Sequence, residues 1–300
     1  MSGSLKWILT AFCFLCIKAV FSQGDSLIFS PWVELAVPKA DQIEIDEEDN
    51  LYLLHTRQNK IHKMYAGFGY DSIQSIGGKG IRGEGLNQPV KIRIVNRQTL
   101  YCLDYGNRRL LVMNTNLKIL RDINFLSSGQ PETGNDNGSQ IWPVSFESGP
   151  TGDLFILNQE DNKILKIDTY GKQQTAFGGL DYGQGSLYEP VDLEMNDRNL
   201  LFVSDTVRQQ LKVYDLFGVY QYALYPPEKF HFKGFCLMDK LLVFYNDQAL
   251  CLLSLSTGHY SLYYPDLKGK QIQDITMNRK LMVVLTGEKI LAYRLPGVDY

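Results

Sequence analysis

The sequence predicts an all-β protein, a six-bladed β-propeller of four-stranded antiparallel blades. Two observations lead to this fold class. An apolar pair that begins with leucine recurs at steps of 49, 54, 47, 40 and 40 residues, and a repeat of that length with about four short strands is one propeller blade. Between the pairs, apolar residues alternate with polar ones, as in half-buried strands. The six pairs that mark the blades are Leu51-Tyr52, Leu100-Tyr101, Leu154-Phe155, Leu201-Phe202, Leu241-Leu242 and Leu281-Met282.

The first 22 residues are typical of an export signal. Lys6 precedes an apolar run from Trp7 to Phe21, and Ser22 offers a small side chain for cleavage. We therefore expect a mature chain that starts at Gln23 and forms one domain over residues 23–300, located in the periplasm or at the cell surface or outside the cell. An uncleaved membrane anchor is the alternative, but the run has about 15 residues and a span needs about 20. No transmembrane segment is expected in the mature chain.

A strand-like segment at residues 27–37 precedes the first blade marker. The last marker, at Leu281, leaves room for only two or three strands before the chain stops at Tyr300. We expect the N-terminal segment to complete the last blade, because this pairing would close the ring and protect its edges.

A second marker confirms the register of the repeat. The dipeptides Pro89-Val90, Pro143-Val144 and Pro190-Val191 each place their proline 11 residues before the leucine of the blade pair. A polar turn follows each apolar pair, with residues that tolerate left-handed backbone angles. The turns are at residues 56–60, 105–109, 159–163 and 206–210.

These features resemble the NHL-repeat family of six-bladed propellers. In the second unit the shared pattern is Gly77-Gly78, Gly83, Gly85-Leu86, Pro89-Val90, Leu100-Tyr101, Asp104 and Asn107-Arg108-Arg109-Leu110. A further copy reads Gly178-Gly179, Gly183, Gly185, Leu187, Pro190-Val191, Leu201-Phe202, Asp205 and Gln209-Gln210-Leu211. The resemblance covers residues 40–215 and implies an architecture, not an activity, because such propellers host both binding proteins and enzymes.

Composition restricts the function classes. The 300 residues are 44% hydrophobic, 12% aromatic and 21% charged, which is an ordinary globular balance and does not fit a disordered, collagen-like or coiled-coil chain. The net charge of -3 argues against a nucleic-acid partner that is bound through bulk positive charge.

Three cysteines remain after the leader, and each lies in an apolar run. Cys102, Cys236 and Cys251 are expected to be buried thiols that pack as small hydrophobic side chains. An odd number leaves at least one unpaired, and a Cys236–Cys251 bridge is the less favoured alternative.

The sequence contains no catalytic or metal-binding constellation that can be assigned, and we expect no cofactor. The four histidines (His55, His62, His231, His259) show neither HxH nor HExxH spacing. Asp104, Asn158 and Asp205 follow the same strand in three units, so a structural role in the repeat is preferred over metal binding. Enzymes of similar architecture, the gluconolactonase and amidating-lyase groups, do hold a metal at the channel mouth with ligands from several blades.

Two segments have the character of a binding surface. The polar, glycine-rich insertion at residues 127–140 includes Asn135, Asp136 and Asn137, and Asn137 would accept a glycan only in a eukaryotic secretory pathway. The second segment is rich in aromatic residues, which pack well between strands but also favour interfaces. Its candidate binding residues are Tyr214, Phe217, Tyr220, Tyr222, Tyr225, Tyr260, Tyr263 and Tyr264.

From these observations we expect a non-catalytic exported propeller that acts as a protein–protein interaction platform or accessory subunit of a cell-envelope complex. A protein is the expected partner, and a glycan is the second class considered. The alternative is a metal-dependent hydrolase or lyase, similar to a lactonase, with its site at the mouth of the propeller channel.

Overall fold

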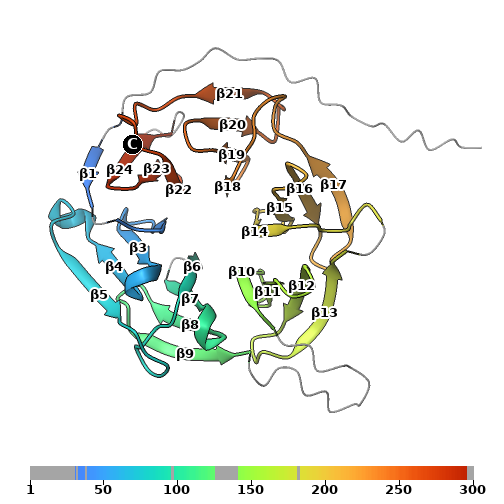
Figure 1. Ribbon diagram of the computed structural model, residues 1–300, viewed down its shortest axis with the longest axis horizontal. Coiled ribbons are helices and arrows are strands. Elements are labelled where there is room, and N and C mark those ends of the chain that lie inside the picture. The colour runs from blue at the N-terminus through green and yellow to red at the C-terminus, as the bar shows by residue number, and fades with distance from the viewer. Residues whose placement is uncertain are drawn as a thin grey trace, which may run out of the picture.

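The protein is a six-bladed β-propeller, as the sequence predicts. The computed structural model describes residues 31, 33–37, 39–95, 98–125, 141–180 and 183–295. Six four-stranded antiparallel sheets surround a central channel (Figure 1). The expected leader at residues 1–22 and the insertion at residues 127–140, with Asn135, Asp136 and Asn137, lie outside the described residues.

Each blade runs from an inner strand at the channel to an outer strand at the rim. Blade 1 contains β2(Gln42–Ile45), β3(Leu51–His55), β4(Lys60–Met64) and β5(Ile73–Gly77). Blade 2 contains β6(Pro89–Val95), β7(Thr99–Asp104), β8(Arg109–Asn114) and β9(Ile119–Asn124), and blade 3 contains β10(Pro143–Ser148), β11(Leu154–Asn158), β12(Lys163–Ile167) and β13(Gln173–Gly178). Blade 4 contains β14(Pro190–Met195), β15(Leu201–Asp205), β16(Gln210–Tyr214) and β17(Tyr220–Leu224), and blade 5 contains β18(Gly234–Met238), β19(Leu241–Tyr245), β20(Leu250–Ser254) and β21(Tyr260–Tyr263).

Blade 6 is completed by the N-terminal strand, which confirms the predicted closure. Its order is β1(Val33–Ala36), β24(Lys289–Arg294), β23(Leu281–Thr286) and β22(Ile272–Met277). The pairing of β1 with β24 is antiparallel, and Leu35 is opposite Ile290. The backbone edge of β24 is thereby covered by β1.

The prolines of the repeat begin the inner strands. Pro89, Pro143 and Pro190 are the first residues of β6, β10 and β14, and the register shifts directly after each of them. Proline has no N–H to donate, so a strand start beside a bulge is a position where it costs little.

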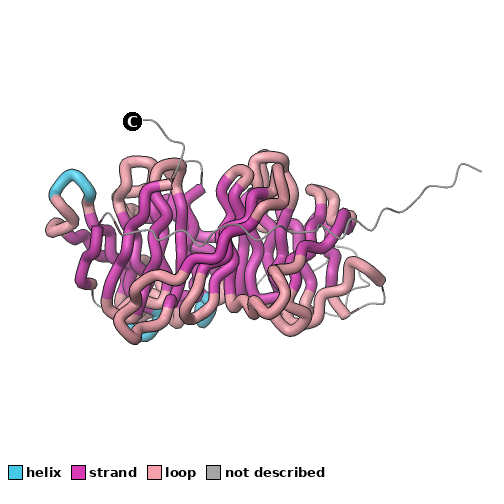
Figure 2. The backbone as a smooth tube through the Cα atoms, turned by 90° about the horizontal axis from the view of Figure 1, so that it is seen from above, coloured by secondary structure: helices cyan, strands magenta, loops and turns pink. Residues whose placement is uncertain are grey.

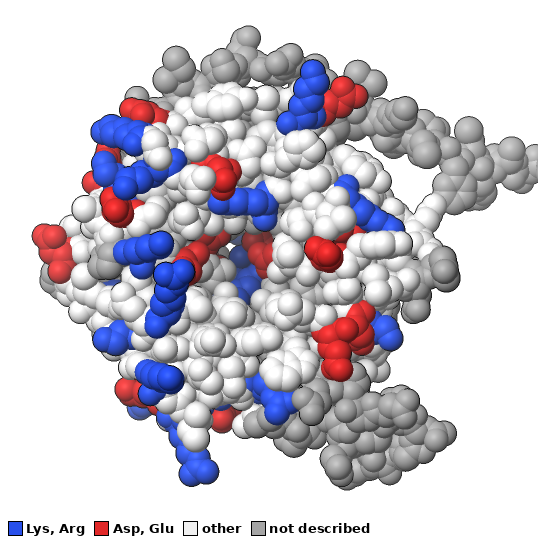
Figure 3. All heavy atoms as spheres, viewed as in Figure 1, with Lys and Arg blue, Asp and Glu red and all other residues white. Residues whose placement is uncertain are grey.

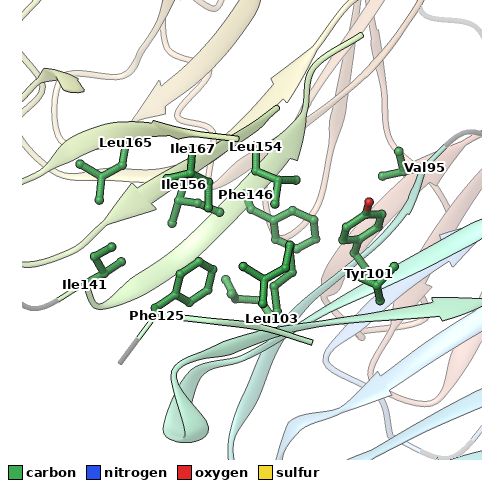
Figure 4. Packing of buried hydrophobic residues seen from close by; sticks show 13 residues of the cluster. Val95, Tyr101, Leu103, Phe125, Ile141, Phe146, Leu154, Ile156, Leu165 and Ile167 are labelled. Atoms are coloured by element: carbon green, nitrogen blue, oxygen red, sulfur yellow. The ribbon is translucent and has the colours of Figure 1, made fainter. Parts of the chain in front are cut away.

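The blades are held together by apolar side chains that fill the space between neighbouring sheets. Between blades 2 and 3, Leu103, Phe146, Leu154 and Ile156 are all 1% exposed or less (Figure 4). Similar clusters fill the other interfaces between blades. Second strands such as β3, β11 and β15 are buried at every residue, and they thus place side chains in the interfaces on both faces of their blades.

Short 3-10 turns join the second and third strands of the first two blades. The turns η1(Thr56–Gln58) and η3(Tyr105–Asn107) each end in a left-handed residue, Asn59 or Arg108. Close packing also explains a glycine in the segment that precedes the repeat proline. At Gly77, which has φ +105, a Cβ would lie 2.9 Å from the side chain of Leu86, which is 1% exposed.

The ring has two faces, which we name by the inner strands. The inner strands begin at the front face, toward the viewer in Figure 1, where η1 and η3 lie, and they end at the rear face. Figure 2 shows the ring from its side, with η2(Ala66–Phe68) on the rear face. Within the described ranges, no helix has the length and apolar character needed to cross a membrane.

Candidate functional site

The inner strands place charged side chains in the central channel at two levels. The level near the front contains Lys91, Ser145, Asp192 and Asp274. The level near the rear lies two residues further along each strand. It contains Glu44, Arg93, Glu147, Glu194, Cys236 and Thr276. Acidic and basic side chains meet around the central opening of the front face (Figure 3).

Arg93 is the centre of the rear level. Its guanidinium lies 3.0 Å from Glu147, 3.2 Å from Glu194 and 3.5 Å from Glu44. These glutamates belong to blades 3, 4 and 1, so one cation joins four inner strands across the channel. Burial is tolerable for such charges only because they are paired with each other.

Lys91 holds the front level together. Its ammonium forms an ion pair with Asp192 and lies 2.9 Å from the hydroxyl of Ser145, which itself donates to Asp192 at 2.5 Å. Blades 2, 3 and 4 are thus connected through one buried lysine.

Other channel side chains accept hydrogen bonds from the free backbone edges of neighbouring blades. Gln42 accepts from the Ile92 N–H at 2.7 Å, Asp274 from the Ile43 N–H at 2.9 Å, and Glu194 from the Leu237 N–H at 2.8 Å. An inner strand is the edge of its sheet, so these side chains satisfy groups that would otherwise be unpaired.

Burial strongly raises the pKa of two channel carboxyls whose hydrogen bonds and ion pairs do not offset the loss of water. Desolvation raises the pKa of Glu44 to about 8, even though Arg93 opposes the shift. Desolvation also raises the pKa of Asp274 to about 7, against the hydrogen bond from Ile43. Near neutral pH, Glu44 is therefore mostly protonated and Asp274 partly so, because burial makes the charged form costly.

Asp104, Asn158 and Asp205 have structural hydrogen-bond partners. Asp104, which is fully buried, accepts from the Asn87 N–H at 2.7 Å and from Arg109 Nε at 2.9 Å. Asn158 accepts from the Trp142 N–H at 2.7 Å, and Asp205 accepts from the Tyr188 N–H at 3.3 Å. Each side chain ties the end of a second strand to the loop that enters its blade.

The structure separates the histidines into one pair and two exposed residues. The rings of His55 and His62 are 4.5 Å apart, while His231 and His259 are exposed. Among the described residues, no three His, Cys, Asp or Glu side chains are arranged to hold a metal ion. Cys102, Cys236 and Cys251 are buried free thiols, so the Cys236–Cys251 bridge does not form.

The aromatic candidates are dispersed over several environments. Tyr214 and Tyr263 are buried at 1% and 4% exposure, and Tyr220 and Tyr260 are half-buried. Phe217, at 79% exposure, lies in a rear turn, and Tyr222, at 42%, lies on the outer strand β17. Tyr225 and Tyr264 are exposed in loops of the front face.

The front face over blades 3, 4 and 5 carries further exposed apolar side chains and a hollow. The hollow has a volume of about 510 Å³ and is lined by Lys229, His231, Gln248 and Tyr264 among others. Arg208 stacks on the ring of Tyr188 with its guanidinium carbon 3.6 Å from the ring centre. We call the exposed set the front apolar surface; it consists of Leu180, Tyr188, Val191, Val207, Tyr225 and Tyr264.

The channel residues were missed by the sequence analysis, although a signal for them exists. Glu44, Arg93, Glu147 and Glu194 each stand seven residues before a blade leucine. They alternate with the apolar residues that revealed the strands. A charge recurring in register at a strand position is the signal that would have found them.

Comparison with known proteins supports the fold only. No family model and no curated protein sequence matches the chain. Solved structures that resemble it include virginiamycin B lyase of Staphylococcus aureus in selenomethionine form, with a TM-score of 0.60 and 14% identity, covering 88% of this chain and 98% of that chain. A streptogramin B lyase has a TM-score of 0.58 and 12% identity over 90% and 88% of the two chains. A chain of a mitotic checkpoint complex has a TM-score of 0.57 and 10% identity over 98% and 99%. The chain is thus similar to propellers of unlike function.

Proposed function

We propose that the protein is a non-catalytic interaction platform that binds a protein partner through the front apolar surface. The platform would serve as an accessory subunit of a cell-envelope complex after export. The observation that carries the proposal is the grouping of exposed apolar side chains on one face, beside a hollow. Tyr225 and Tyr264 are 54% and 63% exposed, and Val207 is 60% exposed. Exposed apolar side chains that gather on one face mark interaction sites, and tyrosine and arginine are enriched in such sites.

The charges on the rest of the front face suggest the character of the partner. Exposed basic side chains lie on the front loops of blades 1 and 2, at Arg57, Lys60, Lys79 and Arg82. A partner with an apolar centre and an acidic flank would complement both parts, because opposite charges across an interface steer association and suppress wrong partners.

The channel residues support a platform better than the alternative lyase. Arg93 and Lys91 are already paired with channel carboxylates, and Asp104 is already bonded to Asn87 and Arg109. Groups committed to internal bonds of this kind make a rigid frame, and a rigid frame lowers the entropy that binding would otherwise cost.

Site-specific crosslinking in the native cell tests the proposal. A photoreactive residue in place of Tyr264 is expected to give one discrete protein adduct. Adding Val207→Asp should abolish that adduct, because a charge is placed in the apolar contact. The matched control is Tyr170→Asp, since Tyr170 is 92% exposed in a turn of the rear face, and it should leave the adduct intact. An adduct that survives Val207→Asp, or no discrete adduct at all, contradicts the platform.

A further inference from the structure

The rear end of the channel opens into a cavity that the platform does not use. Its volume is about 280 Å³, and Glu44, Arg93 and Thr276 lie in its lining together with the apolar side chains of Ile94, Met238 and Met277. The cavity therefore combines a polar group of side chains from blades 1, 2 and 6 with a hydrophobic wall. Sites for small molecules have this composition.

Two buried polar side chains of the cavity lack hydrogen-bond partners. Glu44 is 7% exposed and Thr276 is 3% exposed. Within the described part of the chain, neither the Glu44 carboxyl nor the Thr276 hydroxyl forms a hydrogen bond; Glu44 forms an ion pair with Arg93, at 3.5 Å. That distance exceeds a normal charge-assisted hydrogen bond. Because both residues line the cavity, a ligand bound there can supply the hydrogen-bond donor that the protein does not provide.

The charge balance of the channel indicates the sign of the ligand. Lys91 and Arg93 are outnumbered by the carboxyls of Glu44, Glu147, Glu194, Asp192 and Asp274. The pKa of Glu194 is also raised by desolvation. Uncompensated buried carboxylates must take up either protons or a cation. Glu44 and Asp274 take up protons near neutral pH, so the uncompensated charge arises when they ionise, and a cationic ligand then completes the rear level.

We propose that the rear cavity binds an alkylammonium group. The Glu44 carboxylate and the Thr276 hydroxyl accept two of the three N–H bonds that an ammonium donates. The wall formed by Ile94, Met238 and Met277 covers the methylene groups of the chain. An organic cation suits the site better than a metal ion, because the cavity is partly apolar and the described residues hold no set of three metal-type ligands. The same chemistry is presented by a lysine side chain of a protein and by a free amine.

Calorimetric titration with defined probes tests this site. The probes are n-butylammonium chloride and Nα-acetyl-lysine methylamide, in borate buffer at about pH 9, where the Glu44 carboxyl is ionised. Both are expected to bind saturably, and binding should weaken as the pH falls and Glu44 takes up its proton. Higher affinity for the lysine derivative would identify a protein side chain as the source, and equal affinity would identify a free amine.

Three variants separate the site from nonspecific charge. Glu44→Gln should weaken binding about tenfold or more, because it removes a charged acceptor. Thr276→Val, which keeps the side-chain shape, should weaken binding about threefold through the loss of one neutral hydrogen bond. Glu48→Gln is the matched control, since Glu48 is an exposed acid outside the cavity lining, and it should bind as the parent does.

The proposal is overturned if neither amine binds the parent protein, or if a folded Glu44→Gln variant binds them unchanged. It is also overturned if calcium chloride binds at the site and displaces the amines. Should Glu44→Gln fail to fold, Thr276→Val decides, and unchanged binding to it then rejects the site. None of these outcomes depends on the front apolar surface, so this proposal and the platform can fail separately.

Discussion

At the scale of single residues, Arg93 helps to fix the relative positions of four blades. Its guanidinium contacts carboxylates from three other blades, at distances of 3.0 to 3.5 Å. A buried ion cluster of this kind adds little net stability compared with apolar packing, because desolvation offsets the attraction. What it provides is geometric selection, since a blade out of place would leave a buried charge unpaired.

Glu44 and Asp274 predict a protein that loses stability as the pH rises from about 4 to about 8. Their pKa values are raised to about 8 and about 7 by burial, from 4.5 and 3.8. The folded state therefore binds more protons than the unfolded state. This contribution is fully present below the unfolded pKa values, is lost progressively as the pH rises from them to the folded values, and is gone above the folded values.

We expect the free energy of unfolding to fall between about pH 4 and pH 8, by about 1.4 kcal/mol per carboxyl for each pH unit between its unfolded and its raised pKa, and to level off above about pH 8. Urea unfolding at several pH values, in buffers free of amines, measures the slope. Glu44→Gln should flatten it, because only Asp274 then titrates in this window. A slope that is the same in the parent and in the variant would show that Glu44 is ionised in the folded protein.

At the scale of elements, the junction at the end of β7 is stabilised by Asp104. This carboxylate accepts from the Asn87 N–H, from Asn107 at 2.7 Å and from Arg109 Nε, and Arg109 is 5% exposed. Asp104→Ala should lower the free energy of unfolding by about 3 to 5 kcal/mol, because the buried Arg109 guanidinium loses its buried carboxylate partner. Chemical unfolding measures the loss. The control is Asp122→Ala, whose half-exposed carboxylate lies 3.9 Å from Arg109 and should contribute less than about 1 kcal/mol. Equal losses in the two variants would refute this assignment.

The elements were predictable from the sequence because each blade is a local repeat. Leu100, Leu154 and Leu201 mark the second strands through spacing alone, and the alternation of apolar residues gives the strands themselves. The site was not predictable in the same way. Arg93 meets Glu194, 101 residues later, only because the ring brings their inner strands together. The exposure of Tyr225 and the burial of Tyr214 also depend on neighbouring blades. The sequence alone therefore does not distinguish the exposed tyrosine from the buried one.

At the scale of the whole molecule, the ring closes through a single pairing between the two ends of the described chain. β1 covers the edge of β24 over four residue pairs, and the Val37 N–H bonds to the Glu288 carbonyl at 3.0 Å. An uncovered edge strand is a template for pairing with another chain. The ring is thus a closed system in which no blade is terminal.

Removing residues 1–36 should therefore lower the stability of the protein and cause it to self-associate. We expect the melting temperature to fall by several degrees, since a loss of about 1 kcal/mol shifts it by about 2 to 4 °C for a domain of this size. We also expect dimers or larger species, because β24 is then an open edge. A synthetic peptide with the sequence of residues 31–40, added in trans, should restore the melting temperature and the original elution volume in gel filtration. Glu34→Gln in the full chain is the control, because the exposed ion pair of Glu34 with Lys289 contributes little. A truncated protein that stays monomeric, melts like the parent and ignores the peptide would show that the blades hold the ring closed without β1.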